Sequence, residues 1–471
     1  MPTVSDLNTV KRYLPWVVAI TLFMEQLDST IVNTSIPAMA RSLAVSPLSL
    51  KAVVTSYILS LAVSIPVSGW LAERFGSRRI FLAAVALFTA SSVLCGLSPG
   101  AGMLIAARVP QGIAAAMMMP IGRMAIVRTF PKGELLQAMS FVIVPALIGP
   151  LLGPAVGGVI VHWLSWRDIF FVNVPVGLGA LWFGHRHMPD YRNERPLPLD
   201  VVGLLLFSSG AALLSWLLEI FGEHHLSAPR LAGLFLLSLV LLAAYAWHAG
   251  RTPFPLLRLS LFRTRTFRIS VLGGFVTRLG IGGMPLLMPL LYQLGMGLPA
   301  WQSGLLMMPL AAAAMAMKAI VPQLLRHFGY RRILIVNTIL VAVAIMGYSL
   351  VGPGTALLAI VLLGLALGLG NSLQFSCMNS MAYADIEDAD AGMASALAGT
   401  LQQTSLSFGL ACASLLTGFF LAEQSQTDRV AVTLALHRAF LTLAGLTVVS
   451  SLSFWTLRPG DGESVSRSTV G

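Results

Sequence analysis

The chain has 471 residues, of which 56% are hydrophobic and only 10% are charged, and its mean hydropathy is +0.81. Soluble globular proteins carry roughly a quarter charged residues, so this composition excludes a soluble multidomain enzyme and predicts an integral membrane protein. The net charge of +11 does not indicate nucleic acid as a partner, because the basic residues stand singly or in small groups between apolar runs. The 3 cysteines lie in apolar runs without metal-ligand spacing, so neither a disulfide framework nor a metal site is expected.

Apolar runs long enough to cross a bilayer follow one another along the whole chain. A crossing helix needs about 20 apolar residues, so a chain of this length has room for about fourteen. The first run is too long for the apolar part of a cleavable signal peptide, and we expect it to remain as a membrane helix. The expected spans are 14–39, 51–72, 80–98, 102–127, 135–162, 169–184, 199–221, 231–249, 267–294, 302–325, 333–351, 355–383, 392–421 and 437–457.

Lys and Arg are concentrated in alternate connections between these runs, beginning with Lys11 and Arg12 in the N-terminal segment. Cytoplasmic loops of membrane proteins carry such an excess of Lys and Arg. The pattern therefore predicts a multi-pass protein of a bacterial inner membrane with both termini in the cytoplasm.

An internal repeat links the two ends of the chain. The segment Glu73-Arg-Phe-Gly-Ser-Arg-Arg-Ile80 aligns with Arg326-His-Phe-Gly-Tyr-Arg-Arg-Ile333, sharing Phe, Gly, both arginines and Ile. The repeat predicts a six-helix bundle at 1–190, a linker with two extra membrane helices at 191–266, and a second six-helix bundle at 267–471. Two similar bundles are typical of alternating-access transporters, which bind substrate between their halves near the membrane midplane.

The connection between the second and third runs reads Gly69-Trp-Leu-Ala-Glu-Arg-Phe-Gly-Ser-Arg-Arg79. This segment resembles the loop signature of the major facilitator superfamily, although Glu73 replaces the usual Asp and Ser77 the first usual Arg. The resemblance implies a cytoplasmic gate, in which the loop is held against a helix start near Asp390 to Gly392 in the other half. An anchor on the cytoplasmic side is the alternative, but it would need neither the glycines nor the acid. The expected gate residues are Gly69, Glu73, Arg74, Gly76, Arg78 and Arg79.

A second motif, Gly149-Pro-Leu-Leu-Gly-Pro-Ala-Val-Gly-Gly158, lies in the fifth run. It resembles the antiporter signature of the same family, which is associated with proton-driven export. Small residues spaced by four also allow close helix packing, and a plain packing face is the alternative interpretation. That alternative accounts for the glycines but not for the ordered Gly-Pro and Gly-Gly pairs. The motif residues are Gly149, Gly153, Pro154, Gly157 and Gly158.

Three further stretches point to one branch of this family. They are Leu27-Asp-Ser-Thr-Ile-Val-Asn33, Arg108-Val-Pro-Gln-Gly112, and Ser165-Trp-Arg167 followed by Phe170, Asn173 and Pro175. Together they resemble the fourteen-helix drug:proton antiporter branch. The resemblance implies an all-α integral membrane fold of two pseudo-symmetric six-helix bundles plus two inserted helices.

Ionisable side chains at membrane depth are costly and usually mark ion or substrate pathways. Glu25 and Asp28 stand three residues apart on one face of the first run, a placement suited to carrying a proton. The resemblance favours Asp28 as the coupling residue, while the alternative is that Asp28 only neutralises Arg108. Arg278 is the repeat equivalent of Glu25, and symmetry places both near a central cavity. Expected proton-coupling residues are Asp28, Glu25 and Arg108, and expected substrate contacts are Arg278, Arg123, Lys318 and Gln111.

The sequence thus predicts a proton-coupled antiporter that exports small organic compounds, of the multidrug efflux type. The alternative is an exporter of organic anions such as carboxylates or metal-carboxylate chelates, because four basic residues against two acids suit an anion. That alternative weakens if Arg123 and Lys318 only extend toward the membrane surface. No cofactor is expected beyond the proton gradient, and the expected partners are a small-molecule substrate, protons and the lipid bilayer, with the chain as a monomer. A membrane enzyme and a signalling receptor are disfavoured, because no nucleophilic cluster and no sizeable soluble domain are apparent.

Overall fold

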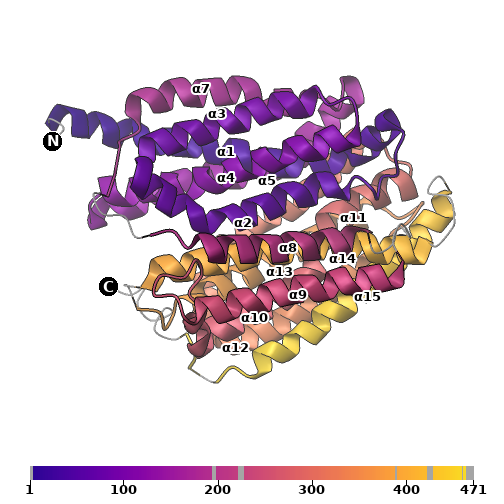
Figure 1. Ribbon diagram of the computed structural model, residues 1–471. Coiled ribbons are helices and arrows are strands. Elements are labelled where there is room, and N and C mark those ends of the chain that lie inside the picture. Colours follow the sequence, from indigo (N-terminus) through magenta and orange to yellow (C-terminus); the bar gives the residue numbers. More distant parts are fainter. Residues whose placement is uncertain are drawn as a thin grey trace. The chain divides into compact units, whose positions relative to one another are not determined.

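The computed structural model describes residues 4–193, 198–220, 227–387, 390–421, 428–458 and 460–462. All regular secondary structure within these ranges is helical (Figure 1). A helix satisfies its backbone hydrogen bonds internally, which a segment surrounded by hydrocarbon requires. The chain divides into two compact units, Met1–Asp200 and Val201–Gly471.

The first unit contains seven helices in its described part, and α6 is a single short turn that leads into α7. Each helix follows one of the first six apolar runs. Their bounds are α1 Val4–Leu43, α2 Lys51–Phe75, α3 Ser77–Gly96, α4 Ala101–Thr129, α5 Lys132–Trp163, α6 Asp168–Phe171 and α7 Asn173–His187.

The second unit follows the remaining runs, with two departures from straight helices. The ninth run is broken into α10, α11 and a π-helical turn η2, because prolines and glycines interrupt it. The tenth and eleventh runs form two helices that meet directly at a kink at Gly329, and together they make up α12. The bounds are α8 Val201–Ile220, α9 Ala228–Ala249, η1 Leu259–Arg263, α10 Arg265–Ile281, α11 Met284–Leu290, η2 Leu291–Gly295, α12 Ala300–Gly347, η3 Tyr348–Leu350, α13 Leu357–Ala382, α14 Ala391–Leu421 and α15 Arg429–Trp455.

Ten helical segments of the described chain are long and apolar enough to cross a membrane. One of them, 300–350, spans 51 residues and covers two of the expected crossings. Helix α7 has only 15 residues. Helix α1 has 40 residues, but Glu25 and Asp28 interrupt its apolar stretch. An all-helical membrane fold is therefore established, while the number of fourteen crossings stays a prediction.

Glycine makes the connection in both copies of the sequence repeat. Gly76 separates α2 from α3 with φ of 99°, and Gly329 kinks α12 with φ of 70°. We expected a loop at each of these places, and the structure instead changes helix direction at one residue. Side chains rarely adopt positive φ, so glycine is the residue that allows so short a connection. The two repeat copies therefore share backbone geometry as well as sequence.

The glycine motif of α5 packs directly on α1. A Cβ atom placed on Gly149 would lie 2.8 Å from Cβ of Gln26, and one on Gly157 would lie 2.6 Å from the carbonyl oxygen of Ile31. Gly153, between them, faces the Thr30 hydroxyl at similarly close range. Residues spaced by four lie on one helix face, so the three glycines form a flat surface for α1. The motif thus brings α5 against the segment of α1 that carries Asp28.

Helices α10 and α14 repeat this type of contact in the second unit. A Cβ on Gly409 would lie 2.6 Å from the carbonyl oxygen of Arg278, and a Cβ on Gly283 would collide with Ala413. The helix that carries Arg278 is therefore packed as tightly as the one that carries Asp28.

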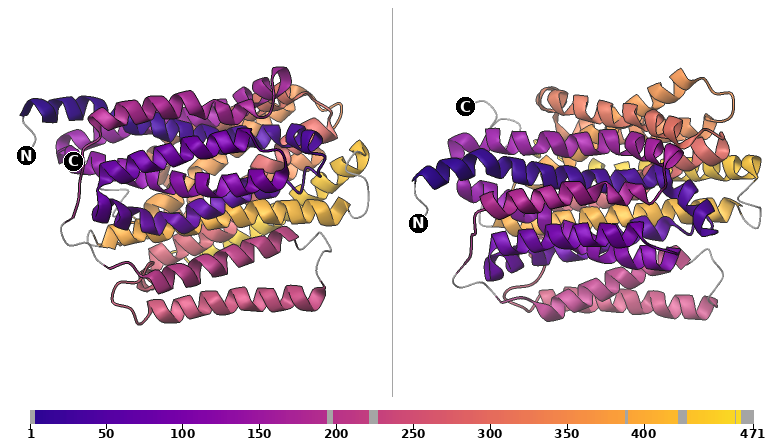
Figure 2. Two further views of the ribbon diagram at one scale, coloured as in Figure 1. Left: turned by 45° about the horizontal axis from the view of Figure 1, so that its top comes forward. Right: turned by 90° about the horizontal axis from the view of Figure 1, so that it is seen from above.

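Helices α8 and α9 lie side by side (Figure 2) and belong to the second unit. Helix α8 also packs on α14, where the hydroxyls of Ser215 and Ser407 are 3.4 Å apart. Residues 194–197 of the expected linker lie outside the described residues. The division into 1–190, 191–266 and 267–471 stays a prediction.

The contact between α1 and α5 can be tested by Gly157→Ala. The added methyl group meets a backbone carbonyl that cannot move away, so we expect a loss of about 1 to 3 kcal/mol in stability, seen as a lower Tm in detergent. Gly179→Ala is the matched control, because nothing lies within 4 Å of a Cβ atom at that helical glycine. Equal Tm values for the two variants would contradict the packing argument.

Candidate functional site

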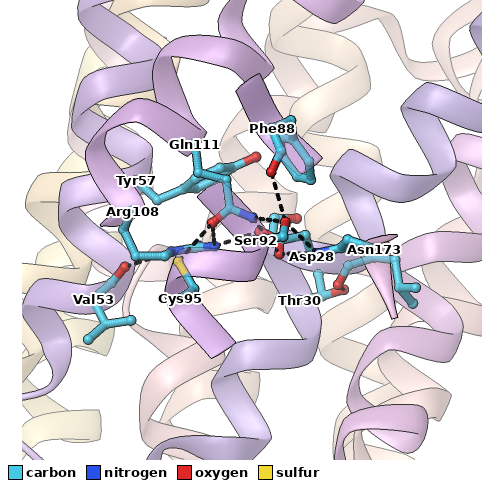
Figure 3. A network of polar contacts seen from close by, with 12 residues as sticks. Asp28, Thr30, Val53, Tyr57, Phe88, Ser92, Cys95, Arg108, Gln111 and Asn173 are labelled. Atoms are coloured by element: carbon cyan, nitrogen blue, oxygen red, sulfur yellow. Dashed lines mark hydrogen bonds and ion pairs between the residues drawn. The ribbon is translucent and has the colours of Figure 1, made fainter. Parts of the chain in front are cut away.

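An ion pair between α1 and α4 lies buried within the first unit (Figure 3). Arg108 Nη1 donates to Asp28 Oδ2 at 2.6 Å, and both side chains have 0% exposure. Removing two charges from water costs more than their attraction returns unless further hydrogen bonds satisfy them. The surroundings of this pair therefore decide whether it is stable.

Two amide groups complete the environment of the Asp28 carboxylate. Its Oδ1 accepts a hydrogen bond of 3.0 Å from Gln111 Nε2 and one of 2.7 Å from Asn173 Nδ2. Gln111 stands three residues after Arg108 on α4, so both reach Asp28 from one helix face. Hydrogen bonds to a charged acceptor are stronger than neutral ones. The ionised form of Asp28 is thus fully accommodated inside the helix bundle.

The Arg108 guanidinium has partners besides Asp28. Its Nε donates to the Val53 carbonyl oxygen at 3.1 Å, and Nη1 also donates to Gln111 Oε1 at 2.7 Å. Its Cζ lies 4.2 Å from the centre of the Tyr57 ring, which gives a cation–π contact. Its Nη2 has no hydrogen-bond partner among the described residues. Arg108 therefore keeps neutral partners on α2 and α4 that do not depend on Asp28.

Ser92 on α3 links the two amides. Its hydroxyl accepts from Gln111 Nε2 at 2.9 Å and from Asn173 Nδ2 at 3.3 Å, and it donates to the Phe88 carbonyl at 2.9 Å. The network thus contains side chains or backbone of α1, α2, α3, α4 and α7 (Figure 3). A change in charge at Asp28 would therefore alter contacts that join five helices.

Glu25 lies close to this network but does not join it. It is one helical turn from Asp28, is 8% exposed, and its Oε2 has no hydrogen-bond partner among the described residues. The two acids thus share a helix face as predicted from their spacing, but they have different environments. Asp28 is surrounded by hydrogen-bond donors, whereas Glu25 is a buried carboxyl group with one oxygen that accepts no hydrogen bond from the described residues.

Of the expected substrate contacts, Arg278 is the one in the second unit that is buried. It is 4% exposed, and its Nη2 reaches Gln402 Oε1 only at 3.4 Å. Its Cζ lies 5.0 Å from the centre of the Phe375 ring, and its Nε has no hydrogen-bond partner in the described part of the chain. No carboxylate of the described chain forms an ion pair with it. Arg278 is thus a buried cation held by an amide and an aromatic ring.

The other expected substrate contacts have different surroundings. Arg123 on α4 and Lys318 on α12 are exposed, which is compatible with side chains that extend toward the membrane surface. Gln111 is 0% exposed and bonded within the Asp28 network. Both ends of its amide are occupied, so its observed role is to hold Asp28 and Arg108.

The segment Gly69 to Arg79 is held by contacts inside the first unit. Glu73 Oε1 lies 3.8 Å from Arg128 Nη2 at the end of α4. The backbone N–H of Arg78 donates to Asp190 Oδ1 at 3.1 Å, and the Ser77 N–H donates to the Tyr191 carbonyl at 3.0 Å. Asp190 and Tyr191 follow α7, and no sequence motif predicted their role. In the second unit Asp390 pairs with Arg258, and the clamp of the loop on 390–392 stays a prediction.

Three residues of the Asp28 network escaped the prediction from sequence. Asn173 carried a signal, because it belongs to the stretch that resembles the antiporter branch. Ser92 and Tyr57 are ordinary members of apolar helices and carried none. In the described residues, no group of three or more His, Cys, Asp or Glu could hold a metal ion. The charged groups of this site are one buried carboxylate and one buried guanidinium in contact with each other.

The role of Ser92 can be tested against its neighbour. Ser92→Ala removes an acceptor from two buried amides, so we expect a loss of about 1 kcal/mol and a lower Tm in detergent. Ser91→Ala is the matched control, because the Ser91 hydroxyl is buried without a hydrogen-bond partner in the described structure. If Ser91→Ala lowered the Tm as much as Ser92→Ala, the hydrogen bonds of Ser92 would not be important for stability.

Comparisons with known proteins agree with this architecture. The family model described as Major Facilitator Superfamily matches residues 18–410. A protein of Serratia proteamaculans named "Putative multidrug resistance protein MdtD" is 38% identical over 439 residues, covering 93% of this chain and 92% of the relative. The protein of the same name from Salmonella paratyphi A is 39% identical over 453 residues, covering 96% of both.

Solved structures share the fold at low sequence identity. A crystal structure of the peptide transporter POT in complex with sulfate has a TM-score of 0.69 at 15% identity, covering 96% of this chain and 95% of that one. The xylose transporter XylE from E. coli, in its inward open conformation, has a TM-score of 0.64 at 14% identity, covering 97% and 99%. The family match and these relatives show that the chain belongs to the Major Facilitator Superfamily and is a multi-pass membrane transporter.

Proposed function

We propose that this chain is a proton-coupled antiporter that exports small organic compounds across a bacterial inner membrane. The observation that carries the proposal is the Asp28–Arg108 pair, fully buried among helices of the first unit. A charge pair at membrane depth is expensive and is typical of an ion pathway. Relatives named for multidrug resistance support an organic compound as the cargo.

Proton coupling follows from what the pair loses when Asp28 is protonated. A neutral carboxyl group no longer attracts Arg108, while Arg108 keeps the Val53 carbonyl and the Gln111 amide oxygen as partners. The hold between α1 and α4 then weakens, although no charge is left without hydrogen bonds. The antiporter would use this difference, with one helix arrangement favoured by the ionised acid and another by the protonated acid. Glu25, one turn away with an open oxygen, is a second position for the proton.

The two family motifs fit the same scheme. The glycines of α5 pack on α1 next to Asp28, so movement of α1 would carry α5 along. The segment Gly69 to Arg79 would act as the cytoplasmic gate, with Arg128, Asp190 and Tyr191 holding it in the first unit. The proposal includes fourteen crossings, cytoplasmic termini and a monomeric chain, with the bundles at 1–190 and 267–471 and two extra helices in 191–266.

Arg278 favours a second candidate function, the export of organic anions such as carboxylates or their metal chelates. A guanidinium without a carboxylate partner at membrane depth costs at least about 2.5 to 3.5 kcal/mol. Its contacts here are one long hydrogen bond to Gln402 and the Phe375 ring. An anionic cargo would neutralise this charge, and a flat carboxylate matches the two-pronged guanidinium.

Asp28→Asn tests the coupling, because an amide keeps the size of the side chain but cannot exchange a proton. In proteoliposomes with an imposed pH gradient, we expect accumulation of rhodamine 6G or fluorescein to fall to background. Exchange of dye for dye at equal pH needs no net proton movement and should persist. Gradient-driven accumulation at the wild-type level would contradict the assignment, and loss of both activities with a collapsed Tm would indicate a purely structural pair.

The choice of cargo is tested by Arg278→Ala and Arg278→Lys with two dyes that share a ring system. For the anion fluorescein we expect Arg278→Ala to raise the KM by about tenfold, with partial recovery in Arg278→Lys. For the cation rhodamine 6G we expect no loss. Arg123→Gln removes an exposed basic residue and is the control for general charge effects. A loss confined to rhodamine 6G, or an equal loss for both dyes, would remove the anion candidate.

A further inference from the structure

A groove of about 730 Å³ runs between α3 and α7 on the surface of the first unit. These two helices lie side by side (Figure 1), with the start of α3 next to the end of α7. Ala83 and Ala86 of α3 line the groove. The methyl side chains of these two alanines leave space between the helices unfilled, which explains why a groove forms here.

One face of α7 forms the opposite wall, and its polarity changes along its length. The lining residues Leu178, Leu181, Trp182, His185 and Arg186 recur at intervals of three and four. This spacing places them in one stripe on the helix. The stripe begins with two leucines and ends with an imidazole and a guanidinium at the last turn of α7. An apolar channel with a cationic end matches a molecule that has an apolar tail and an anionic head.

The cationic end is exposed, and none of the described residues that line it is acidic. Trp182 is 61% exposed, and Arg186 Cζ lies 4.9 Å from the centre of its ring. Arg186 forms no ion pair with another described residue. Tryptophan and arginine in this arrangement are typical of the level of lipid headgroups.

A second groove, between α1 and α5, contains an acidic residue close to its basic ones. It is lined by Lys11, Arg12 and Glu134 among other residues, and Lys11 Nζ lies 2.8 Å from Glu134 Oε2. Its basic end is therefore partly neutralised by the protein itself. None of the described residues that line the groove between α3 and α7 is acidic, so the charge of Arg186 is available to a ligand.

We propose that the groove between α3 and α7 binds an anionic phospholipid such as phosphatidylglycerol. The phosphate lies against Arg186 and His185, the glycerol region against Trp182, and one acyl chain along Leu178, Leu181 and Ala83. A zwitterionic lipid fits less well, because its ammonium group would find no carboxylate in the groove. A free phosphate ion would leave the apolar length of the groove unused.

The bound lipid also stabilises the end of α7. The His185 carbonyl accepts a hydrogen bond from the Arg78 guanidinium, so the cationic end of the groove is joined to the start of α3. A lipid that bridges α3 and α7 at this point opposes their separation. Its binding is therefore expected to raise the Tm of the protein in detergent.

Native mass spectrometry of the detergent-purified full chain tests the proposal with phosphatidylglycerol and phosphatidylcholine of identical acyl chains. We expect the wild-type protein to prefer phosphatidylglycerol and Arg186→Gln to lose about fivefold of that preference. Arg12→Gln, at the end of the second groove, is the matched control and should keep the preference. Ala86→Leu fills the groove and should weaken binding of both lipids. Equal preference in wild type and Arg186→Gln would overturn the proposal.

Quenching of tryptophan fluorescence by brominated lipid is a second measurement, which reports where the lipid binds. Brominated phosphatidylglycerol should quench wild-type tryptophan fluorescence more than brominated phosphatidylcholine does, and Trp182→Phe should abolish the difference. An undiminished difference in Trp182→Phe would place the lipid elsewhere. Inorganic phosphate at millimolar concentration should not reduce the quenching, and reduction by phosphate would show that the groove binds a free anion instead of a lipid.

Discussion

The Asp28–Arg108 pair imposes a constraint on the whole first unit, because two opposite charges without access to water are stable only if further contacts offset the loss of their hydration. Five helices contribute such contacts, although Arg108 Nη2 has no hydrogen-bond partner among the described residues. The amides of Gln111 and Asn173 bind one carboxylate oxygen, and the Val53 carbonyl and Tyr57 ring bind the guanidinium. Helices that could otherwise pack in several ways are thereby fixed relative to one another. The proposed proton coupling depends on the same arrangement, since protonation of Asp28 would remove the charge around which these groups are arranged.

Close packing of α1 is the second requirement. The glycine surface of α5 brings the two backbones together on the side of Gln26, Thr30 and Ile31. One face of α1 therefore packs against α5, and another carries the ion pair of Asp28. In hydrocarbon, helix association depends on such close contacts, since apolar side chains gain little by leaving lipid. The glycine motif of α5 therefore has a direct structural role. It holds the helix that carries the acid.

The two units are similar in construction and different in charge. Gly76 and Gly329 make equivalent connections, and the packing of α10 on α14 parallels that of α1 on α5. The first unit pairs its buried arginine with an acid, whereas Arg278 in the second has only neutral partners. A repeated scaffold with unequal charges divides the proposed work between proton exchange in one unit and cargo binding in the other. The groove of α3 and α7 adds a third kind of site, on the surface, where the partner is the membrane.

Composition and periodicity determined the fold class, because a chain this apolar can satisfy its backbone only as helices in a bilayer. Local spacing also determined that Glu25 and Asp28 share a helix face and that Gly149, Gly153 and Gly157 form a packing surface. Tertiary structure alone decided which groups surround the Asp28–Arg108 pair. The hydroxyl of Ser92 and the ring of Tyr57 belong to helices whose sequences do not indicate this role. It likewise decided that Arg123 and Lys318 are exposed while Arg278 is buried. Side-chain burial and pairing depend on how helices distant in sequence are rotated against each other, and the hydrophobicity of one helix does not specify that rotation when all of its faces are apolar.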